Sequence, residues 1–158
     1  MQVTGDNNAP DLFLRGGALL FSAARPAAGA LFRPCFDDLD NDGDIDVVIL
    51  NSNAPPSLLR NDSIGKNHWL QLSLRGTTGN RDGVGAKVRV FAGDQIYVDE
   101  VHSGRGYQSH FGTRLHFGLG DKDRVDKIEV RWPNGKIEKF DGVQTNQHVH
   151  LREGTQEK

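Results

Sequence analysis

The stretch Leu70-Gln71-Leu72-Ser73-Leu74 places an apolar side chain at every second position, with polar residues between them. Side chains on a β-strand alternate between its two faces, so this pattern predicts a strand with one buried face and one wet face. The same alternation recurs in two other stretches, Ala86 to Val90 and Ile128 to Trp132. No long stripe at helical spacing competes with them. The pattern predicts an all-β fold.

Shorter segments extend this prediction along the chain. We expect further strands at Leu12–Arg15, Ala18–Phe21, Val47–Leu50, Gln95–Val101, Leu115–Leu119, Lys136–Phe140 and Gln147–Leu151. Pro133-Asn134-Gly135 predicts a tight hairpin turn before the strand at Lys136, because asparagine and glycine tolerate positive φ. Short strands joined by glycine-rich turns favour a β-sandwich or barrel-like module.

The acidity of the chain is one local feature. The formal net charge is −2, but six aspartates lie between Asp37 and Asp46, so the remaining residues sum to +4. The basic residues form no stripe, which makes a nucleic-acid partner unexpected. No apolar run approaches the roughly 18 residues of a transmembrane segment. The single cysteine, Cys35, excludes an internal disulfide and a cysteine-based zinc site.

The acidic stretch has the spacing of a calcium loop. Asp38 to Asp46 fits D-x-D-x-D-G-x-x-D, with Gly43 at the sixth position, where a sharp turn is needed. Oxygen ligands at such positions converge on one point, and five of them favour Ca²⁺. The expected ligands are the side chains of Asp38, Asp40, Asp42 and Asp46 and the carbonyl of Asp44. An acidic surface turn is the alternative. An EF-hand would need a glutamate where Ile49 stands, within a predicted strand.

The first part of the chain contains a weak internal repeat. Residues 11–17 resemble residues 56–62, about 45 residues later, which is the period of a propeller blade. Because a single blade cannot bury both of its faces, we expect residues 1–65 to be a repeat fragment from a longer propeller-containing chain. Residues 66–152 would then form a separate β module, and residues 153–158 a tail.

Two family resemblances follow from these motifs. The aspartate loop and the strand that leaves it resemble the calcium loops of FG-GAP (integrin-type) propeller repeats. Residues 67–151 resemble the ASPIC/UnbV family in five ordered blocks: Asn67-His68-Trp69-Leu70, residues 80–86, Gly104-Arg105-Gly106-Tyr107, residues 116–120 and residues 130–135. This resemblance implies a secreted, periplasmic or cell-surface protein that carries a propeller before the module. The polar start of the chain lacks the features of a signal peptide, so the alternatives are a cytoplasmic protein and a piece of a secreted one.

The second module offers a few candidate binding residues. Arg81 and Asp82 either stitch a loop to the sheet or recognise a sugar or an acidic group. Arg105 and Tyr107 lie in a glycine-rich turn that follows the strand ending near Glu100, so we expect these three side chains at one loop end. His116 is read first as a packed strand residue and second as a catalyst. His148 and His150 share a strand face, but the sequence identifies no third metal ligand for them.

The sequence therefore predicts a calcium-binding adhesion or binding module with a protein or glycan partner. No arrangement of base and nucleophile is visible, so catalysis is the less favoured class. The alternative is an enzyme or accessory protein of bacterial secondary metabolism, because some relatives resemble products of such pathways. Its site would use Arg81, Asp82, Glu100, Tyr107 and His116.

Overall fold

The computed structural model describes residues 13–15, 18–20, 33–51, 55–63, 65–105 and 110–155. Every regular element in these residues is a β-strand, which confirms the all-β prediction. The same residues contain no helix long and apolar enough to cross a membrane. The chain divides into two compact units, one of residues 1–64 with 106–111 and one of residues 65–105 with 112–158.

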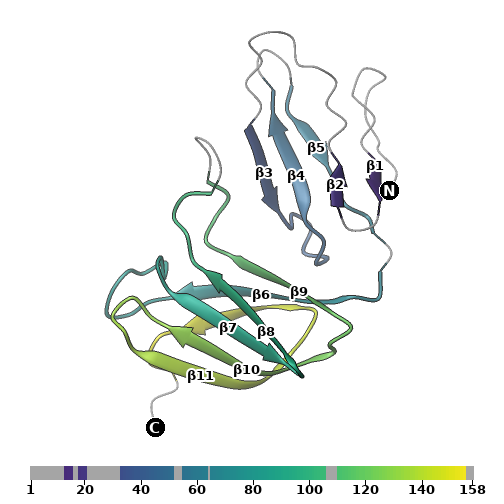
Figure 1. Ribbon diagram of the computed structural model, residues 1–158. Coiled ribbons are helices and arrows are strands. Elements are labelled where there is room, and N and C mark those ends of the chain that lie inside the picture. Colours follow the sequence, from purple (N-terminus) through teal and green to yellow (C-terminus); the bar gives the residue numbers. More distant parts are fainter. Residues whose placement is uncertain are drawn as a thin grey trace. The chain divides into compact units, whose positions relative to one another are not determined.

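The first unit contains two small antiparallel sheets. Strands β1 (Phe13–Arg15) and β2 (Ala18–Leu20) form a hairpin. Strands β3 (Arg33–Asp37), β4 (Asp46–Leu50) and β5 (Ser57–Leu59) form a sheet in that order, and Figure 1 shows them side by side in blue. Sequence reasoning did not assign β3 or β5, which have no clear alternation. The ends of two predicted strands, Leu12 and Phe21, lie outside the described residues.

The second unit is built from two sheets. One has the order β12-β6-β9, with bounds Gln147–Arg152, His68–Arg75 and Leu115–Gly120. The other has the order β11-β10-β7-β8, with bounds Ile137–Gln144, Arg124–Arg131, Lys87–Ala92 and Gln95–Glu100. Both sheets have free edge strands in the part of the chain that the structure describes, so this unit is not a closed barrel.

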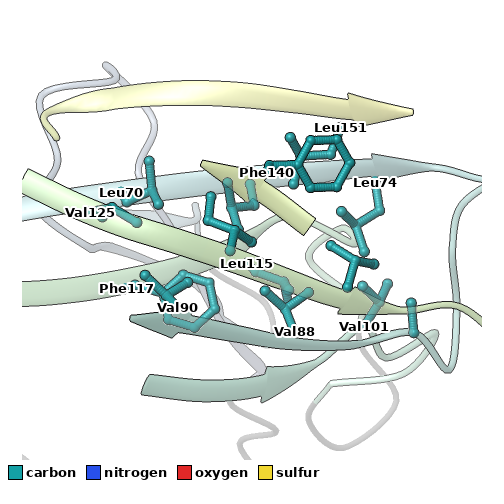
Figure 2. Packing of buried hydrophobic residues seen from close by; sticks show 14 of the residues in the cluster. Leu70, Leu74, Val88, Val90, Val101, Leu115, Phe117, Val125, Phe140 and Leu151 are labelled. Atoms are coloured by element: carbon teal, nitrogen blue, oxygen red, sulfur yellow. The ribbon is translucent and has the colours of Figure 1, made fainter. Parts of the chain in front are cut away.

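A single hydrophobic core lies between these two sheets. Leucines of β6 meet valines of β7 and β10 there, and β9, β11 and β12 add Leu115, Phe117, Phe140 and Leu151, as Figure 2 shows. Each strand contributes alternate residues, as the burial pattern of β7 illustrates: Val88 and Val90 are buried, while Lys87 and Arg89 are exposed. Burial of apolar surface from both sheets in one cluster makes the unit a β-sandwich.

The turn between β10 and β11 confirms the predicted hairpin, with one difference. The backbone N–H of Gly135 donates to the carbonyl of Trp132 at 2.9 Å, and Gly135 has a φ of +89°. Asn134 does not adopt positive φ. Its side-chain oxygen instead accepts a hydrogen bond from the Lys136 N–H at 2.9 Å. The asparagine therefore stabilises the turn through its side chain.

Strands β6 and β12 pair in parallel, whereas every other described pair is antiparallel. Ser73 lies opposite His150, and Arg75 lies opposite Arg152. The leucines at positions 70, 72 and 74 face the core, so these four polar residues share the opposite face of the sheet.

Candidate functional site

The aspartate loop connects β3 to β4, and the pair Asp37 and Asp46 closes it. Two residues of the loop adopt positive φ: Asn41 at 60° and Gly43 at 97°. The left-handed conformation at Gly43 agrees with the turn predicted for the sixth position, because glycine adopts it without strain.

Three of the predicted ligands converge in this loop. Carboxylate oxygens of Asp38, Asp40 and Asp42 all lie within 4.8 Å of one another. The Asp38 side chain is buried and accepts hydrogen bonds from the backbone N–H groups of Asp42 at 3.1 Å and Gly43 at 2.9 Å. These bonds hold the loop in the conformation that gathers the carboxylates.

The side chains of the other two residues in the predicted set, Asp46 and Asp44, accept hydrogen bonds from the backbone. Both oxygens of the buried Asp46 carboxylate accept hydrogen bonds, from the Leu39 N–H at 2.9 Å and the Asn61 N–H at 2.8 Å. The Asp44 side chain accepts a hydrogen bond from the backbone of Ser63. Asp46 therefore ties the loop to the segment after β5, a role that its spacing did not reveal.

The loop carries electrostatic strain. Loss of solvent raises the pKa of Asp42, and the negative charges of Asp40, Asp38 and Asp46 raise it further. The pKa of Asp44 is raised by burial first and by Asp42 second. Negative charge on Asp42 and Asp44 is thus unfavourable in the protein alone. Sequence reasoning missed one nearby cation, Arg60, which pairs with Asp62 at 2.6 Å and lies 3.8 Å from Asp40.

The donor chemistry of this cluster fits a hard divalent cation. All three converging ligands are carboxylates, and oxygen donors are what Ca²⁺ takes in proteins. Among the residues that the structure describes, this is the one group of at least three acidic, histidine or cysteine side chains close enough to share an ion.

Arg81 and Asp82 are exposed, and the loop around them is held by Asn80. The Asn80 side-chain oxygen accepts hydrogen bonds from the backbone of Asp82 at 2.9 Å and Val84 at 3.3 Å. Asn80 therefore holds the loop together internally, and backbone hydrogen bonds join it to its neighbours, from Gly76 to Arg81 and from Gly85 to Val101; no described contact pairs Arg81 with Asp82.

The residues predicted around Glu100 have separate partners. Arg105 donates to the carbonyl of Glu100 at 3.4 Å and pairs with Asp99 at 3.6 Å. The Glu100 carboxylate lies 3.6 Å from Lys87. Tyr107 lies outside the described residues. Placement of Arg105 near Glu100 agrees with the expected loop end, whose role in binding stays a prediction.

Three histidines, His116, His148 and His150, lie on the face of the β12-β6-β9 sheet that points away from the core. His116 stacks on Trp69, with ring centroids 6.3 Å apart, and its Nδ1 is 3.3 Å from the Gln71 amide. His148 and His150 do share a face, with ring centroids 4.4 Å apart, and Ser73 lies 2.7 Å from His148 Nε2. His116 is therefore packed within a strand, as first read.

Sequence reasoning missed two buried glutamates. Glu138 accepts a hydrogen bond from the Trp132 indole at 2.9 Å and from the Gly154 N–H at 2.8 Å. Glu153, placed in the expected tail, is 4% exposed. Its partners Thr77 and Thr78 lie 76 and 75 positions earlier and Asn134 lies 19 positions earlier, so no local signal could have identified them.

Comparison with known proteins shows similarity to two relatives and to one protein family. The chain is 33% identical over 104 residues to cartilage acidic protein 1 of Xenopus tropicalis, and 32% identical to that of Homo sapiens over the same length. Each match covers 63% of this chain but only 16% and 15% of the relatives. The chain thus spans about a sixth of the length of these relatives. The family model described as ASPIC and UnbV matches residues 76–158, more than half of the chain. The chain therefore belongs to the ASPIC/UnbV family.

Proposed function

We propose that this chain is a calcium-stabilised module of extracellular type that binds a protein or glycan partner. The observation that carries the calcium part is the convergence of the Asp38, Asp40 and Asp42 carboxylates in the β3–β4 loop. Bringing like charges together costs free energy, and a bound divalent cation offsets that cost. Asp46 and the Asp44 carbonyl would complete the set that the FG-GAP resemblance implies.

The partner-binding part is supported by the family and by the fold. Both relatives are named for cartilage, which favours an extracellular setting. The β-sandwich is a rigid scaffold that presents loops, and loops on rigid scaffolds often carry binding residues. The enzymatic alternative would need Arg81, Glu100 and His116 to act at one place. Among the described residues, Glu100 pairs with Lys87, and His116 contacts Trp69 and Gln71, so no observation brings these three together.

Calorimetry with Ca²⁺ tests the metal site directly. We expect one ion to bind with a dissociation constant of about 0.1 to 1 mM, and Mg²⁺ to compete poorly because it demands a tighter octahedral geometry. With a constant of about 0.1 mM, about 2 mM Ca²⁺ would stabilise the folded state by roughly 1.8 kcal/mol.

A double variant and its control complete the experiment. Asp40→Asn with Asp42→Asn should abolish the heat of binding and leave the calcium-free melting temperature unchanged or higher, because carboxylate repulsion is removed. Asp94→Asn with Asp121→Asn changes the charge equally at two exposed positions in the second unit and should bind Ca²⁺ normally. No heat in the native protein at millimolar Ca²⁺, with a melting temperature indifferent to chelator, would overturn the calcium site.

A glycan array and a co-purification screen test partner binding separately. A reproducible glycan or protein partner supports the binding proposal. A bound metabolite in native mass spectrometry would instead favour the enzymatic alternative.

A further inference from the structure

A basic pocket of about 390 Å³ lies in the second unit. Three separate segments line it: the end of β6, the loop after it and the end of β12. Its exposed side chains include three arginines, Arg75, Arg81 and Arg152, together with His150 and Asp82.

The parallel pairing of β6 and β12 places two of these arginines side by side. Arg75 lies opposite Arg152, and Ser73 lies opposite His150 one step along the same face. Because both strands run in the same direction, their C-terminal ends meet at one edge of the sheet. The two guanidinium groups therefore project from neighbouring positions of one face.

Backbone hydrogen bonds bring the third arginine to the same edge. The N–H of Gly76 donates to the carbonyl of Arg81 at 2.9 Å, so the loop folds back next to Arg75. The N–H of Glu153 donates to the carbonyl of Arg75 at 2.9 Å and fixes the end of β12 there. The arginines thus sit on a backbone frame that is already formed without a ligand.

The described part of the unit neutralises the charge of this pocket only in part. Among the described residues, no carboxylate lies within ion-pair distance of the side chains of Arg75, Arg81 or Arg152. The one acidic residue in the lining, Asp82, leaves an excess of two positive charges in a chain whose formal net charge is −2. The nearby Glu153 carboxylate is engaged by Thr77, Thr78 and Asn134.

We propose that this pocket binds a sulfate ester group carried by a glycan. Guanidinium groups donate paired hydrogen bonds that match the oxygens of an oxyanion, and three of them suit a tetrahedral group. The exposed residues of the lining are all polar or charged, while the buried Leu74 and Leu151 add apolar surface to it. His150, together with the Ser73 hydroxyl that also contacts His148, offers hydrogen bonds to sugar hydroxyls. A peptide would instead need apolar pockets for its side chains. This site rests on the partner-binding half of the proposed function and is independent of calcium.

Titration of the full chain with a heparin-derived hexasaccharide tests the site, in chelator so that the aspartate loop plays no part. The desulfated hexasaccharide, inorganic sulfate and a phosphoserine peptide are the comparison ligands. The sulfated hexasaccharide should bind tighter than all three. Arg75→Gln with Arg81→Gln and Arg152→Gln should weaken its binding at least about tenfold, because charge-assisted hydrogen bonds are lost.

A matched triple variant separates the pocket from overall charge. Arg89→Gln with Arg124→Gln and Arg131→Gln removes three positive charges from β7 and β10 and should weaken binding less than about threefold. If both triple variants lost the same affinity for the hexasaccharide, the pocket would be excluded as the binding site, although the protein would still bind the glycan. Tighter binding of the phosphoserine peptide, or binding of inorganic sulfate alone, would overturn the glycan assignment. No binding of the hexasaccharide, with another partner found by screening, would refute this site and preserve the proposed function.

Discussion

The side-chain amide of Asn134 donates a hydrogen bond to Oε1 of Glu153 at 2.6 Å, joining the β10–β11 turn to the residue after β12. The other oxygen of Glu153 accepts bonds from the N–H groups of Thr77 at 2.7 Å and Thr78 at 3.0 Å. The Thr78 hydroxyl donates a further hydrogen bond to Oε1 at 2.7 Å. One buried carboxylate therefore connects three segments that are far apart in the sequence.

Glu153→Gln should lower the free energy of unfolding by about 1 to 3 kcal/mol. The amide keeps the shape of the side chain, but it loses one acceptor and the charge that strengthens each hydrogen bond. Denaturant unfolding measures the change. Glu100→Gln, which removes a carboxylate with a long ion pair to Lys87, is the control and should stay within about 0.5 kcal/mol of the native chain.

The contribution of Glu153 should depend on pH. Backbone hydrogen bonds from Thr77 and Thr78 lower the pKa of Glu153 from 4.5 to about 2. A lowered pKa in the folded state gives stability that is complete above pH 4.5 and lost as the pH falls toward 2. The difference in unfolding free energy between the native chain and Glu153→Gln should therefore shrink across that window. A difference that stays constant from pH 6 to pH 2.5 would contradict this role.

Gly83→Ala should destabilise the second unit by about 2 to 4 kcal/mol. Gly83 has a φ of +66°, and an added Cβ would lie 2.9 Å from the Cβ of Leu74. Gly118→Ala is the matched control, because an added Cβ there has no neighbour within 4 Å. Thermal melts of both variants measure the contrast, and equal melting temperatures would show that the loop relaxes freely.

Calcium affinity should fall as the pH is lowered. The pKa of Asp42 is raised, chiefly by loss of solvent and then by neighbouring carboxylates, so protons compete with the cation for this side chain. The folding stability of the calcium-free protein should change in the opposite direction. A raised pKa means that ionisation of the carboxylate lowers this stability as the pH rises. Calorimetry at pH 7.0, 5.0 and 4.0 measures the affinity, because a carboxylate whose ordinary pKa is 3.8 takes up protons mainly toward the acid end of that range. An affinity independent of pH would place the ion elsewhere.

The strands of the sandwich were predictable because their pattern is local. Alternation placed the strands that became β6, β7 and β10 and identified their buried faces, because a one-residue shift would turn every apolar side chain to water. The boundaries differed by a few residues, as for β11, which continues to Gln144. Strand β3 was not assigned, because its central residues Pro34, Cys35 and Phe36 are all half-buried and show no period.

The candidate site was predictable only in part. The spacing of Asp38, Asp40 and Asp42 identified three side chains that converge, because a short loop brings them together whatever surrounds it. The same spacing assigns Asp46 as a ligand, which stays a prediction, but it did not indicate that both Asp46 oxygens accept hydrogen bonds from the backbone. One of those donors, Asn61, is 15 positions away, beyond the reach of a local motif.

By itself, the sequence determined the all-β class, the inward face of the sandwich strands and the aspartate loop, since each follows from neighbouring residues. Only the tertiary structure decided that β6 and β12 run in parallel, because a period of two is the same for either direction of pairing. That pairing sets Arg75 beside Arg152, and a backbone hydrogen bond across a loop adds Arg81. The basic pocket and the buried Glu153 depend on contacts between segments about 76 residues apart. These segments come together only when the strands between them have packed into the core.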